Sequence, residues 1–302
     1  MKVGVVGIGY WGRKVVKEYA QLLDENYIDY LGLCDYDESK LRDFREYETF
    51  TDFNELLKKV DAVHICTNNE THYELSRKAL EEGVHVLVEK PMTTNRNHAF
   101  NLIELAYENG VILQVGHIYR FANVIKKVRE LYQSNFFGDV YYINLTWSHL
   151  MAPMEKVDIL WDLLPHPLDI LNFVTKKWPD TFLGIGRAFR RNRLNEVASL
   201  QAVFEDRFFA NIHLSWLTPV RRRTMEIVGS ERSAIVECVE QKITIYENEG
   251  GTRQLYVEPN NTIREEIINF IEAIRTGKNN FNSAIIGLRT IELIEEALNS
   301  LR

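Results

Sequence analysis

The chain has 302 residues, of which 45% are hydrophobic and 26% charged, and it carries a formal net charge of −7. A chain of this length forms one large domain or, as we expect here, two. The acidic balance argues against a general nucleic-acid binder, and no apolar run approaches the ~18 residues that a membrane span needs.

The first 35 residues follow the pattern of a dinucleotide-binding unit. An apolar run over residues 3–8 leads into the glycine-rich turn Gly7-x-Gly9-x-x-Gly12, a helical pattern follows over residues 13–23, and a second apolar run ends in Asp35. Gly7 permits the sharp turn, Gly9 lets the backbone approach a pyrophosphate, and Gly12 lets the helix pack close to the strand. A glycine turn that binds nothing is the alternative, but strand, helix and terminal acid all agree with the motif.

Asp35 indicates the choice of cofactor. A carboxylate at the end of the second strand accepts hydrogen bonds from the two hydroxyls of the adenosine ribose. The same carboxylate repels a 2′-phosphate. We therefore expect NAD as the cofactor, with NADP disfavoured.

The rest of the first half alternates helices with strands. Helices are predicted over residues 37–47, 53–59, 71–82 and 95–109, and strands over residues 62–66, 84–88 and 111–115. The spacing predicts a doubly wound, mostly parallel sheet in a Rossmann domain of residues 1–119. Ligands bind at the carboxyl edge of such a sheet, which here carries Thr67-Asn68-Asn69 and Glu89-Lys90-Pro91.

From residue 120 the pattern changes to long alternating segments. Their period of two predicts antiparallel strands over residues 139–147, 181–189, 198–204, 208–216, 224–228, 234–238 and 242–246. Helices are predicted over residues 124–133, 168–173, 263–276 and 283–301. We expect residues 120–302 to form an α+β domain with one large, mostly antiparallel sheet, whose C-terminal helices are able to pack back toward the Rossmann domain.

One face of that sheet should be covered by helices, and the other should carry apolar and aromatic residues. We expect Trp147, Phe204, Phe209 and Trp216 on this second face. A large exposed apolar face usually marks a subunit interface. The sequence therefore predicts a homodimer or homotetramer formed through this face.

The cysteines, Cys34, Cys66 and Cys238, are isolated in apolar segments. Their spacing fits neither a metal site nor a disulfide framework, so we expect buried thiols and no metal. Such thiols fit a reducing cytoplasm. The first residues already form a strand where a signal sequence would stand, which also predicts a cytoplasmic protein.

Two further segments carry residues suited to chemistry. Lys90 precedes a proline at a strand end, on the same sheet edge as Gly9 and Asn69. In the run Trp161-Asp162-Leu163-Leu164-Pro165-His166-Pro167-Leu168-Asp169, Asp162 and His166 share one helix face if the run is helical, with the prolines making its start an irregular lead-in. The alternatives are a surface lysine, a buried structural histidine and a helix N-cap aspartate.

These motifs together resemble the Gfo/Idh/MocA family, named for glucose–fructose oxidoreductase and inositol dehydrogenase. The resemblance rests on GIGYWG, CDYD, CTNNETH, VEKP, GHIYRF and DLLPHPLD, in this order along the whole chain. It implies an NAD(P)-dependent oxidoreductase that moves a hydride between the nicotinamide and a hydroxyl carbon of a sugar, sugar nucleotide or cyclitol. It also implies that Lys90 is the catalytic lysine, that His166 is the general base, and that Asp162 orients the substrate.

The expected site residues follow from the motifs and the resemblance together. The cofactor set comprises Gly7, Gly9, Tyr10, Trp11, Gly12, Asp35, Thr67, Asn69, His72, Glu89 and Lys90. The substrate set comprises Lys90, His117, Arg120, Asp162 and His166, with Asp169 in support. Packing explains His117 as well as a substrate contact does, and a position at a helix start explains His72 as well as a cofactor contact does. His64 is interpreted as a core residue of its strand.

The substrate itself is left open by the sequence. Arginines cluster in two runs, Arg187, Arg190, Arg191, Arg193 and Arg221, Arg222, Arg223. Arginine binds phosphate bidentately, so the clusters indicate either a nucleotide-linked sugar, as in UDP-N-acetylhexosamine 3-dehydrogenases, or solvated loops around the site for a free cyclitol or sugar. A non-catalytic NAD(H) sensor and a reductase of another small molecule are the alternative functions.

Overall fold

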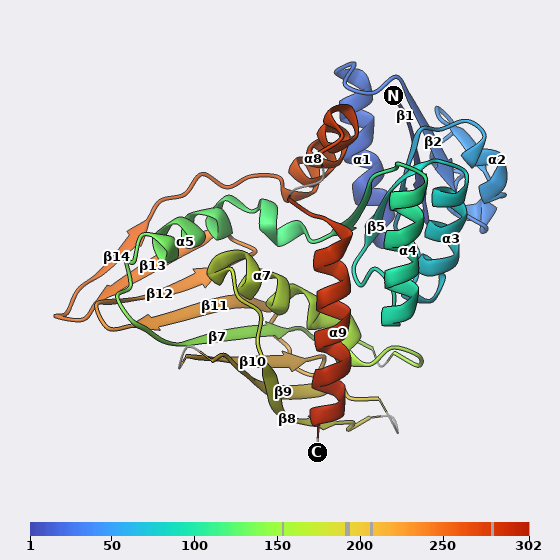
Figure 1. The fold of residues 1–302 in the computed structure, drawn as a ribbon. Coiled ribbons are helices and arrows are strands. Elements are labelled where there is room, and N and C mark those ends of the chain that lie inside the picture. The colour runs from blue at the N-terminus through green and yellow to red at the C-terminus, as the bar shows by residue number, and fades with distance from the viewer. Residues whose placement is uncertain (153, 191–193, 206–207, 279–280, 302) are drawn as a thin grey trace. The chain divides into compact units, whose positions relative to one another are not determined.

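The computed structural model describes the whole chain except residues 153, 191–193, 206–207, 279–280 and 302. The chain forms two compact units (Figure 1). The first unit comprises Met1–His117 and Ile263–Ile291, and the second comprises Ile118–Thr262 and Glu292–Arg302. The domain limits expected from the sequence, 1–119 and 120–302, stay predictions.

The first unit is built on a six-stranded parallel sheet in the order β3-β2-β1-β4-β5-β6. Its strands are β1 (Lys2–Val6), β2 (Tyr30–Cys34), β3 (Glu48–Phe50), β4 (Ala62–Ile65), β5 (His85–Glu89) and β6 (Leu113–Gly116). The strand order reverses between β1 and β4, which is the switch point where doubly wound sheets bind ligands. The prediction of a Rossmann sheet is confirmed.

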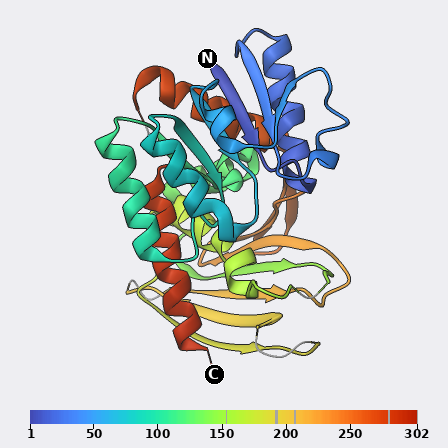
Figure 2. The ribbon, with the colours of Figure 1, turned by 90° about the vertical axis from the view of Figure 1, so that its right-hand side faces the viewer.

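Helices cover both faces of this sheet. They are α1 (Tyr10–Asp24), α2 (Phe53–Leu57), α3 (Asn69–Glu81), α4 (Arg96–Glu108) and α8 (Thr262–Thr276). Helices α3 and α4 pack side by side in both views (Figure 1, Figure 2). On the other face, Tyr19 and Leu22 of α1 share a buried cluster with Val5 of β1 and with Ile267 and Ile271 of α8. A segment from the far end of the chain thus completes the core of the first unit.

The second unit contains an eight-stranded sheet in the order β14-β13-β12-β11-β7-β10-β9-β8. Its strands are β7 (Val140–Ser148), β8 (Thr181–Arg187), β9 (Val197–Val203), β10 (Phe209–Ser215), β11 (Arg222–Gly229), β12 (Arg232–Glu237), β13 (Lys242–Glu247) and β14 (Thr252–Leu255). Only the β7–β10 pair is parallel among these neighbours, so the mostly antiparallel sheet is confirmed.

The helices of the second unit lie on one face of its sheet. They are α5 (Asn123–Gln133), α6 (Ile159–Leu163) and α7 (Pro165–Thr175), and α5 and α7 contact each other over the sheet (Figure 1). The last helix, α9 (Ala284–Ser300), begins in the first unit and ends in the second. Among the helices of the described residues, none combines the length and apolar character of a membrane span.

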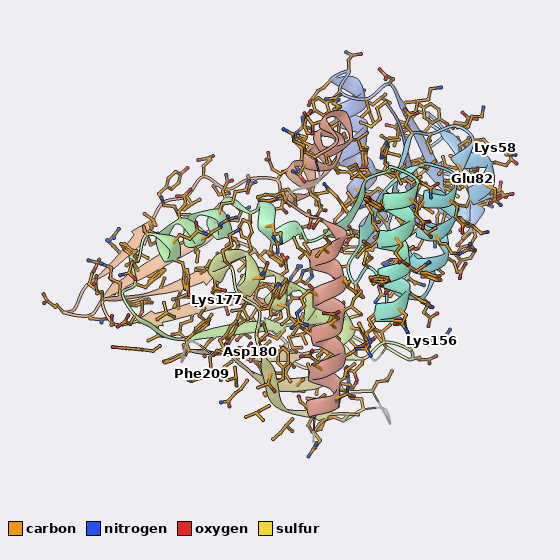
Figure 3. The ribbon with its side chains drawn as sticks, in the orientation of Figure 1. Lys58, Glu82, Lys156, Lys177, Asp180 and Phe209 are labelled. Carbon is orange, nitrogen blue, oxygen red and sulfur yellow. The ribbon has the colours of Figure 1, made fainter. Side chains whose placement is uncertain are left out.

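Two expectations about elements are wrong. The segment 37–47 is not a helix but a short 3-10 turn, η1 (Glu38–Lys40), which Asp37 caps by accepting the backbone N–H of Ser39. The turn carries no buried residue, so nothing stabilises a longer helix there. The second error concerns the exposed sheet face, because Trp147, Trp216 and Phe204 are buried. Of the four residues expected there, Phe209 alone is exposed; Figure 3 labels it.

Candidate functional site in the two units

The turn between β1 and α1 has the geometry that its glycines predict. Gly7 adopts φ +91°, in the left-handed region that favours glycine. A Cβ on Gly12 would overlap the carbonyl oxygen of Gly7, so helix α1 begins pressed against the strand end. A Cβ on Gly9, in contrast, would have no described atom within 4 Å. Packing therefore explains glycine at positions 7 and 12, whereas Gly9 faces open space.

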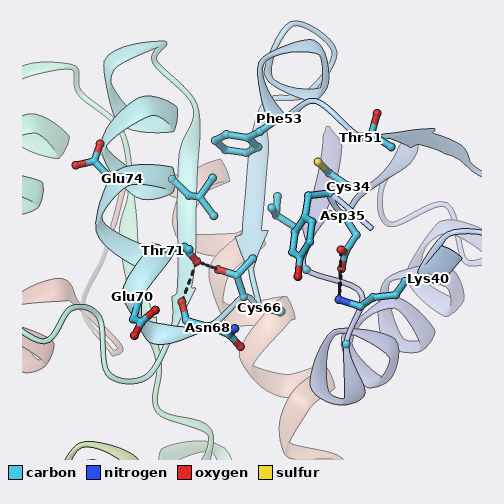
Figure 4. Close-up of a pocket in the computed structure, with 16 residues that line it drawn as sticks. Cys34, Asp35, Lys40, Thr51, Phe53, Cys66, Asn68, Glu70, Thr71 and Glu74 are labelled. Carbon is cyan, nitrogen blue, oxygen red and sulfur yellow. Dashed lines mark hydrogen bonds and ion pairs between the residues drawn. The ribbon is translucent and has the colours of Figure 1, made fainter. Parts of the chain in front are cut away.

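A cavity of about 390 Å³ opens beside this turn, within the first unit (Figure 4). Gly7, Gly9 and Asp35 line it together with Thr67, Asn68 and Lys40. Gly9 occupies the N-cap position of α1 and has no side chain to accept hydrogen bonds from the first N–H groups of the helix. A helix start of this kind attracts phosphate. The cavity, with Gly9 at one point and a carboxylate at another, fits the adenosine diphosphate part of a dinucleotide.

Asp35 is buried at the edge of the cavity. Its Oδ2 accepts the backbone N–H of Ile8 at 2.7 Å, and its Oδ1 accepts that of Asp37 at 3.0 Å. The ammonium of Lys40 lies 3.3 Å from Oδ2 (Figure 4). Backbone bonds thus fix the carboxylate where the sequence predicts that it meets the adenosine ribose.

His72 lies behind the cavity and not at its surface. The side chain is fully buried, with Nδ1 2.9 Å from the carbonyl oxygen of Pro91 and Nε2 3.1 Å from that of Thr67. Burial lowers the pKa of the imidazole, and the hydrogen bonds to Pro91 and Thr67 act in the opposite direction. His72 therefore ties the loop after β4 to the loop after β5, a role that favours positioning over the direct cofactor contact expected from the sequence.

Glu89 also points inward from the carboxyl edge of the sheet. Its Oε1 accepts a hydrogen bond from the Trp11 indole N–H and lies 3.3 Å from Nε2 of His64. Burial raises the pKa of the carboxyl, but the hydrogen bonds from His64 and Trp11 and the nearby Lys90 charge outweigh it, so the pKa is lowered. The carboxylate links the start of α1 to the end of β5, directly before Lys90.

One group of potential metal ligands occurs among the described residues. His64, Cys66 and Glu89 bring ligand atoms within 4.8 Å of one another. Burial holds the pKa of the Cys66 thiol well above its ordinary value, which disfavours the thiolate that a metal would need. His64 and Glu89 are buried and contact each other, and Cys66 is half-buried beside them, so packing explains this cluster better than a metal ion does.

The two helices α6 and α7 meet around Leu164 in the second unit. Asp158 caps α6 by accepting the backbone N–H of Leu160, so the alternative of Asp162 as the N-cap is wrong. Pro165 and Pro167 lie in the first turn of α7, where a backbone N–H has no partner within the helix, so proline is tolerated there. The expected irregular lead-in is therefore wrong, because the helix is regular from Pro165. This joint sets Asp162 at the end of α6 and His166 at the start of α7.

Both side chains contact aromatic residues. The carboxylate of Asp162 accepts a hydrogen bond from the indole N–H of Trp216 at 3.0 Å. The imidazole of His166 packs edge-on against Tyr119, with ring centroids 5.1 Å apart. Both residues are only partly buried. The pair thus stays accessible while its orientation is fixed from two different elements.

Tyr119 and Arg223 extend this group; the sequence assigns no role to Tyr119 and includes Arg223 only in the arginine run suited to phosphate. Burial raises the pKa of Tyr119 to about 12, so its phenol is protonated and can donate. Arg223 donates to the carbonyl oxygen of Ser148 at 2.9 Å and lies 3.0 Å from Nδ1 of His149. Tyr119 is present in GHIYRF and Arg223 in the arginine run, but their proximity depends on the strand pairing of β7 and β11.

The structure gives Arg120 a different environment from the one expected. Its guanidinium is buried and forms an ion pair with Asp169, and it donates to Oδ1 of Asn172 at 2.9 Å. A buried pair of this kind favours a structural role over the predicted substrate contact. His117 is also buried, at the end of the first unit.

The arginine clusters are partly engaged within the protein. Arg190 forms an ion pair with Glu196 at 2.9 Å and donates to the carbonyl oxygen of Met151. Arg221 and Arg222 are exposed, and Arg191 and Arg193 lie outside the described residues. A phosphate-binding role therefore rests on Arg221 and Arg222 more than on the first run.

Family models match both parts of the chain. One, described as an oxidoreductase family with an NAD-binding Rossmann fold, matches residues 1–117, and the Gfo/Idh/MocA C-terminal domain matches residues 125–235. The chain belongs to the Gfo/Idh/MocA family. It is an NAD-binding oxidoreductase, and the family resemblance of its motifs is confirmed.

Several members of the Gfo/Idh/MocA family are similar over almost their whole length. A UDP-N-acetylglucosamine 3-dehydrogenase from Acidithiobacillus ferrooxidans is 26% identical, over 96% of this chain and 94% of its own. A myo-inositol 2-dehydrogenase from Thermotoga maritima is 23% identical, over 92% and 89%. A solved structure of UDP-N-acetylglucosamine 3-dehydrogenase from A. ferrooxidans superimposes with a TM-score of 0.88 over 100% of this chain and 97% of that one, at 26% identity.

The predicted site residues of this Gfo/Idh/MocA protein are thus divided between its units. The first unit holds the glycine turn, Asp35, Thr67, Asn69 and Lys90, and the second holds Asp162 and His166. Tyr10 and Trp11 begin α1, and Asn69 begins α3. Each set lies within one unit.

Proposed function

We propose that the protein is an NAD-dependent dehydrogenase that oxidises a hydroxyl group of a sugar, a nucleotide-linked sugar or a cyclitol. The observation that carries the proposal is the Asp162–His166 pair, which the α6–α7 joint, Trp216 and Tyr119 hold oriented and partly exposed. A protein that only senses NAD(H) needs no such pair. Family membership and the names of the relatives support the same reaction class.

The residues of the chain supply the proton chemistry. The glycine turn and Asp35 would hold NAD, which would supply the hydride acceptor for the carbinol carbon. We assign His166 as the base that takes the hydroxyl proton, because an imidazole titrates near neutral pH. Asp162 orients His166 and the substrate, and the ammonium of Lys90 stabilises the developing alkoxide. In the reverse direction His166 returns the proton.

The substrate class that we favour is a nucleotide-linked sugar, such as a UDP-N-acetylhexosamine oxidised at its 3-hydroxyl. The relative with 26% identity over 96% of this chain is named for that reaction. The exposed Arg221 and Arg222 are suited to a diphosphate. A free cyclitol is the second candidate, because another relative is named as a myo-inositol dehydrogenase.

The proposal is tested by following NADH absorbance with NAD and a panel of UDP-sugars, free sugars and cyclitols. Turnover with one UDP-sugar and none with cyclitols supports the favoured substrate. Turnover with cyclitols alone replaces it with the second candidate. Tight NADH binding with no turnover on any of the three classes supports the sensor or a reductase of another small molecule.

We also propose that the protein acts as a homo-oligomer in the cytoplasm. On strands β8 and β10, Leu183, Ile185 and Phe209 expose apolar side chains on the sheet of the second unit. Beside them, along β10, β7 and β11, Asn211 donates to Asn144 and Asn144 donates to Glu226, so a polar network continues across the sheet. Light scattering of the wild type and of Ile185→Asp tests the interface: a dimer or tetramer that dissociates in the variant is expected.

A further inference from the structure

A cation stands beside the carboxylate that was expected to exclude NADP. The ammonium of Lys40 lies 3.4 Å from Oδ1 and 3.3 Å from Oδ2 of Asp35, and both residues line the same cavity (Figure 4). The side chain of Lys40 is 35% exposed, whereas that of Asp35 is 3% exposed. The charge that a ligand meets here is therefore that of an ion pair and not of an isolated carboxylate.

Asp35 does not need Lys40 to keep its position. The backbone N–H groups of Ile8 and Asp37 each bond to one of its carboxylate oxygens, at 2.7 and 3.0 Å. The buried carboxylate therefore keeps two hydrogen-bond donors when the ammonium moves away. The contribution of Lys40 is thus to the electrostatics of the cavity and not to the geometry of the acid.

The backbone of Lys40 is itself held in place. Its carbonyl oxygen accepts a hydrogen bond from Arg13 of α1 at 3.2 Å, and Arg13 is paired with Asp43 at 2.9 Å. The short turn η1 (Glu38–Lys40) ends at this residue. The position of the chain at Lys40 is consequently fixed relative to the helix whose start faces the cavity, while its four-carbon side chain can still rotate.

We propose that Lys40 determines cofactor specificity, because its ammonium offsets the repulsion between Asp35 and a 2′-phosphate and lets the first unit bind NADP(H) as well as NAD(H). With NAD(H), the ribose hydroxyls donate to Asp35. With NADP(H), the ammonium turns from the carboxylate to the phosphate, to which it donates as a compact, mobile point charge. The inference rests on dinucleotide binding alone and is independent of the proposed substrate.

The test is a binding titration, which needs no substrate. NADH and NADPH are titrated separately into wild type, Lys40→Met, Lys40→Arg and Lys59→Met, and protein fluorescence is recorded. Lys59→Met is the matched control, because Lys59 also forms an ion pair in the first unit, with Glu48 at 3.5 Å, but does not line the cavity. Circular dichroism confirms that each variant is folded.

We expect the wild type to bind both cofactors with dissociation constants within about tenfold of each other. Lys40→Met should weaken NADPH binding by at least about tenfold and NADH binding by less than about threefold. Lys40→Arg should retain NADPH binding, Lys59→Met should change neither, and added salt should weaken NADPH binding more than NADH binding. The inference is overturned if wild type binds NADH alone, or if Lys40→Met weakens both cofactors by the same factor.

Discussion

The Nδ1 atom of His72 lies 2.9 Å from the carbonyl oxygen of Pro91, the residue directly after the proposed catalytic lysine. The other ring nitrogen meets the carbonyl oxygen of Thr67, which lines the dinucleotide cavity. Since a neutral imidazole has a single N–H, the buried ring donates to one of these two carbonyl oxygens at a time while it contacts both the loop that lines the cavity and the loop that carries Lys90. Its protonation state should affect the stability of this joint.

Replacing His72 with Gln should change how stability depends on pH. Burial lowers the pKa of His72 below its ordinary 6.5, so the neutral ring contributes fully above that value, and its contribution is lost as pH falls below 6.5 toward the lower folded pKa. We expect His72→Gln to cost about 1–3 kcal/mol near neutral pH and less in acid. Urea unfolding at several pH values measures the loss of stability near neutral pH and the smaller loss in acid. A variant whose stability runs parallel to that of wild type at every pH contradicts the assignment.

Gly9→Ala and Gly12→Ala form a matched pair in one turn. Gly9 has an extended backbone with φ −80°, and its added Cβ meets no described atom within 4 Å, so Gly9→Ala should leave stability within about 0.5 kcal/mol of wild type. It should nevertheless weaken NADH binding at least about tenfold, because the methyl group occupies the cofactor side. Gly12→Ala should cost about 3 kcal/mol or more through the clash with Gly7. Thermal unfolding and NADH titration separate the two effects, and equal stabilities would contradict this account.

Lys90→Met should keep NADH binding and lose turnover. The substitution removes the ammonium that we assign to the alkoxide but leaves the glycine turn and Asp35 intact. We expect kcat to fall at least about a hundredfold and the dissociation constant of NADH to change by less than about threefold. Lys58→Met is the control, since Lys58 is exposed and pairs with Glu55 in the same unit (Figure 3). Normal turnover by Lys90→Met would remove the lysine from the mechanism.

Two substitutions separate the structural role of Asp162 from its catalytic role. Asp162→Asn keeps an oxygen that accepts the Trp216 N–H, whereas Asp162→Ala leaves that indole without this acceptor. Both should lower kcat by at least about tenfold, but only the alanine variant should also lose about 1–3 kcal/mol of stability. Steady-state kinetics and urea unfolding report the two quantities. If Asp162→Asn is fully active, the carboxylate has no part in catalysis.

Arg120 and Asp169 should behave as a buried ion pair. Arg120→Met leaves the Asp169 carboxylate buried without its cation and should cost about 3–5 kcal/mol. The double variant Arg120→Met/Asp169→Leu removes both charges and should recover most of that loss. Denaturant unfolding of the single and double variants measures the coupling. A single variant that unfolds like wild type would return Arg120 to the list of substrate contacts.

The parts of the site that depend on neighbouring residues in sequence could be predicted. The glycine turn and Asp35 lie within one strand–helix–strand segment, and each residue has a role that local geometry fixes. The hydrogen bond from Trp216 to Asp162 joins residues 54 positions apart, and the contact of Arg223 with His149 depends on pairing β11 with β7. No local pattern reports such contacts. For the same reason, the burial of His72 and Arg120 could not be predicted.

The strands β3 and β14 and the turn η1 were missed for a related reason. Each is short and carries no buried residue, so it adds no periodic apolar signal to the sequence. The error at η1 had the largest effect on the interpretation. A helix over residues 37–47 gives no reason to set Lys40 beside Asp35, whereas the short turn does.

Ile267 and Ile271 of α8 complete a core whose other members belong to the first 41 residues of the chain. A ribosome must therefore translate nearly the whole protein before this hydrophobic cluster can close. Until then, the cluster that contains Tyr19 and Leu22 lacks two of its buried members, and its apolar surface stays partly exposed to water. The hydrophobic core of the first unit, although most of its residues are synthesised early, can thus close only after residue 271 has been made.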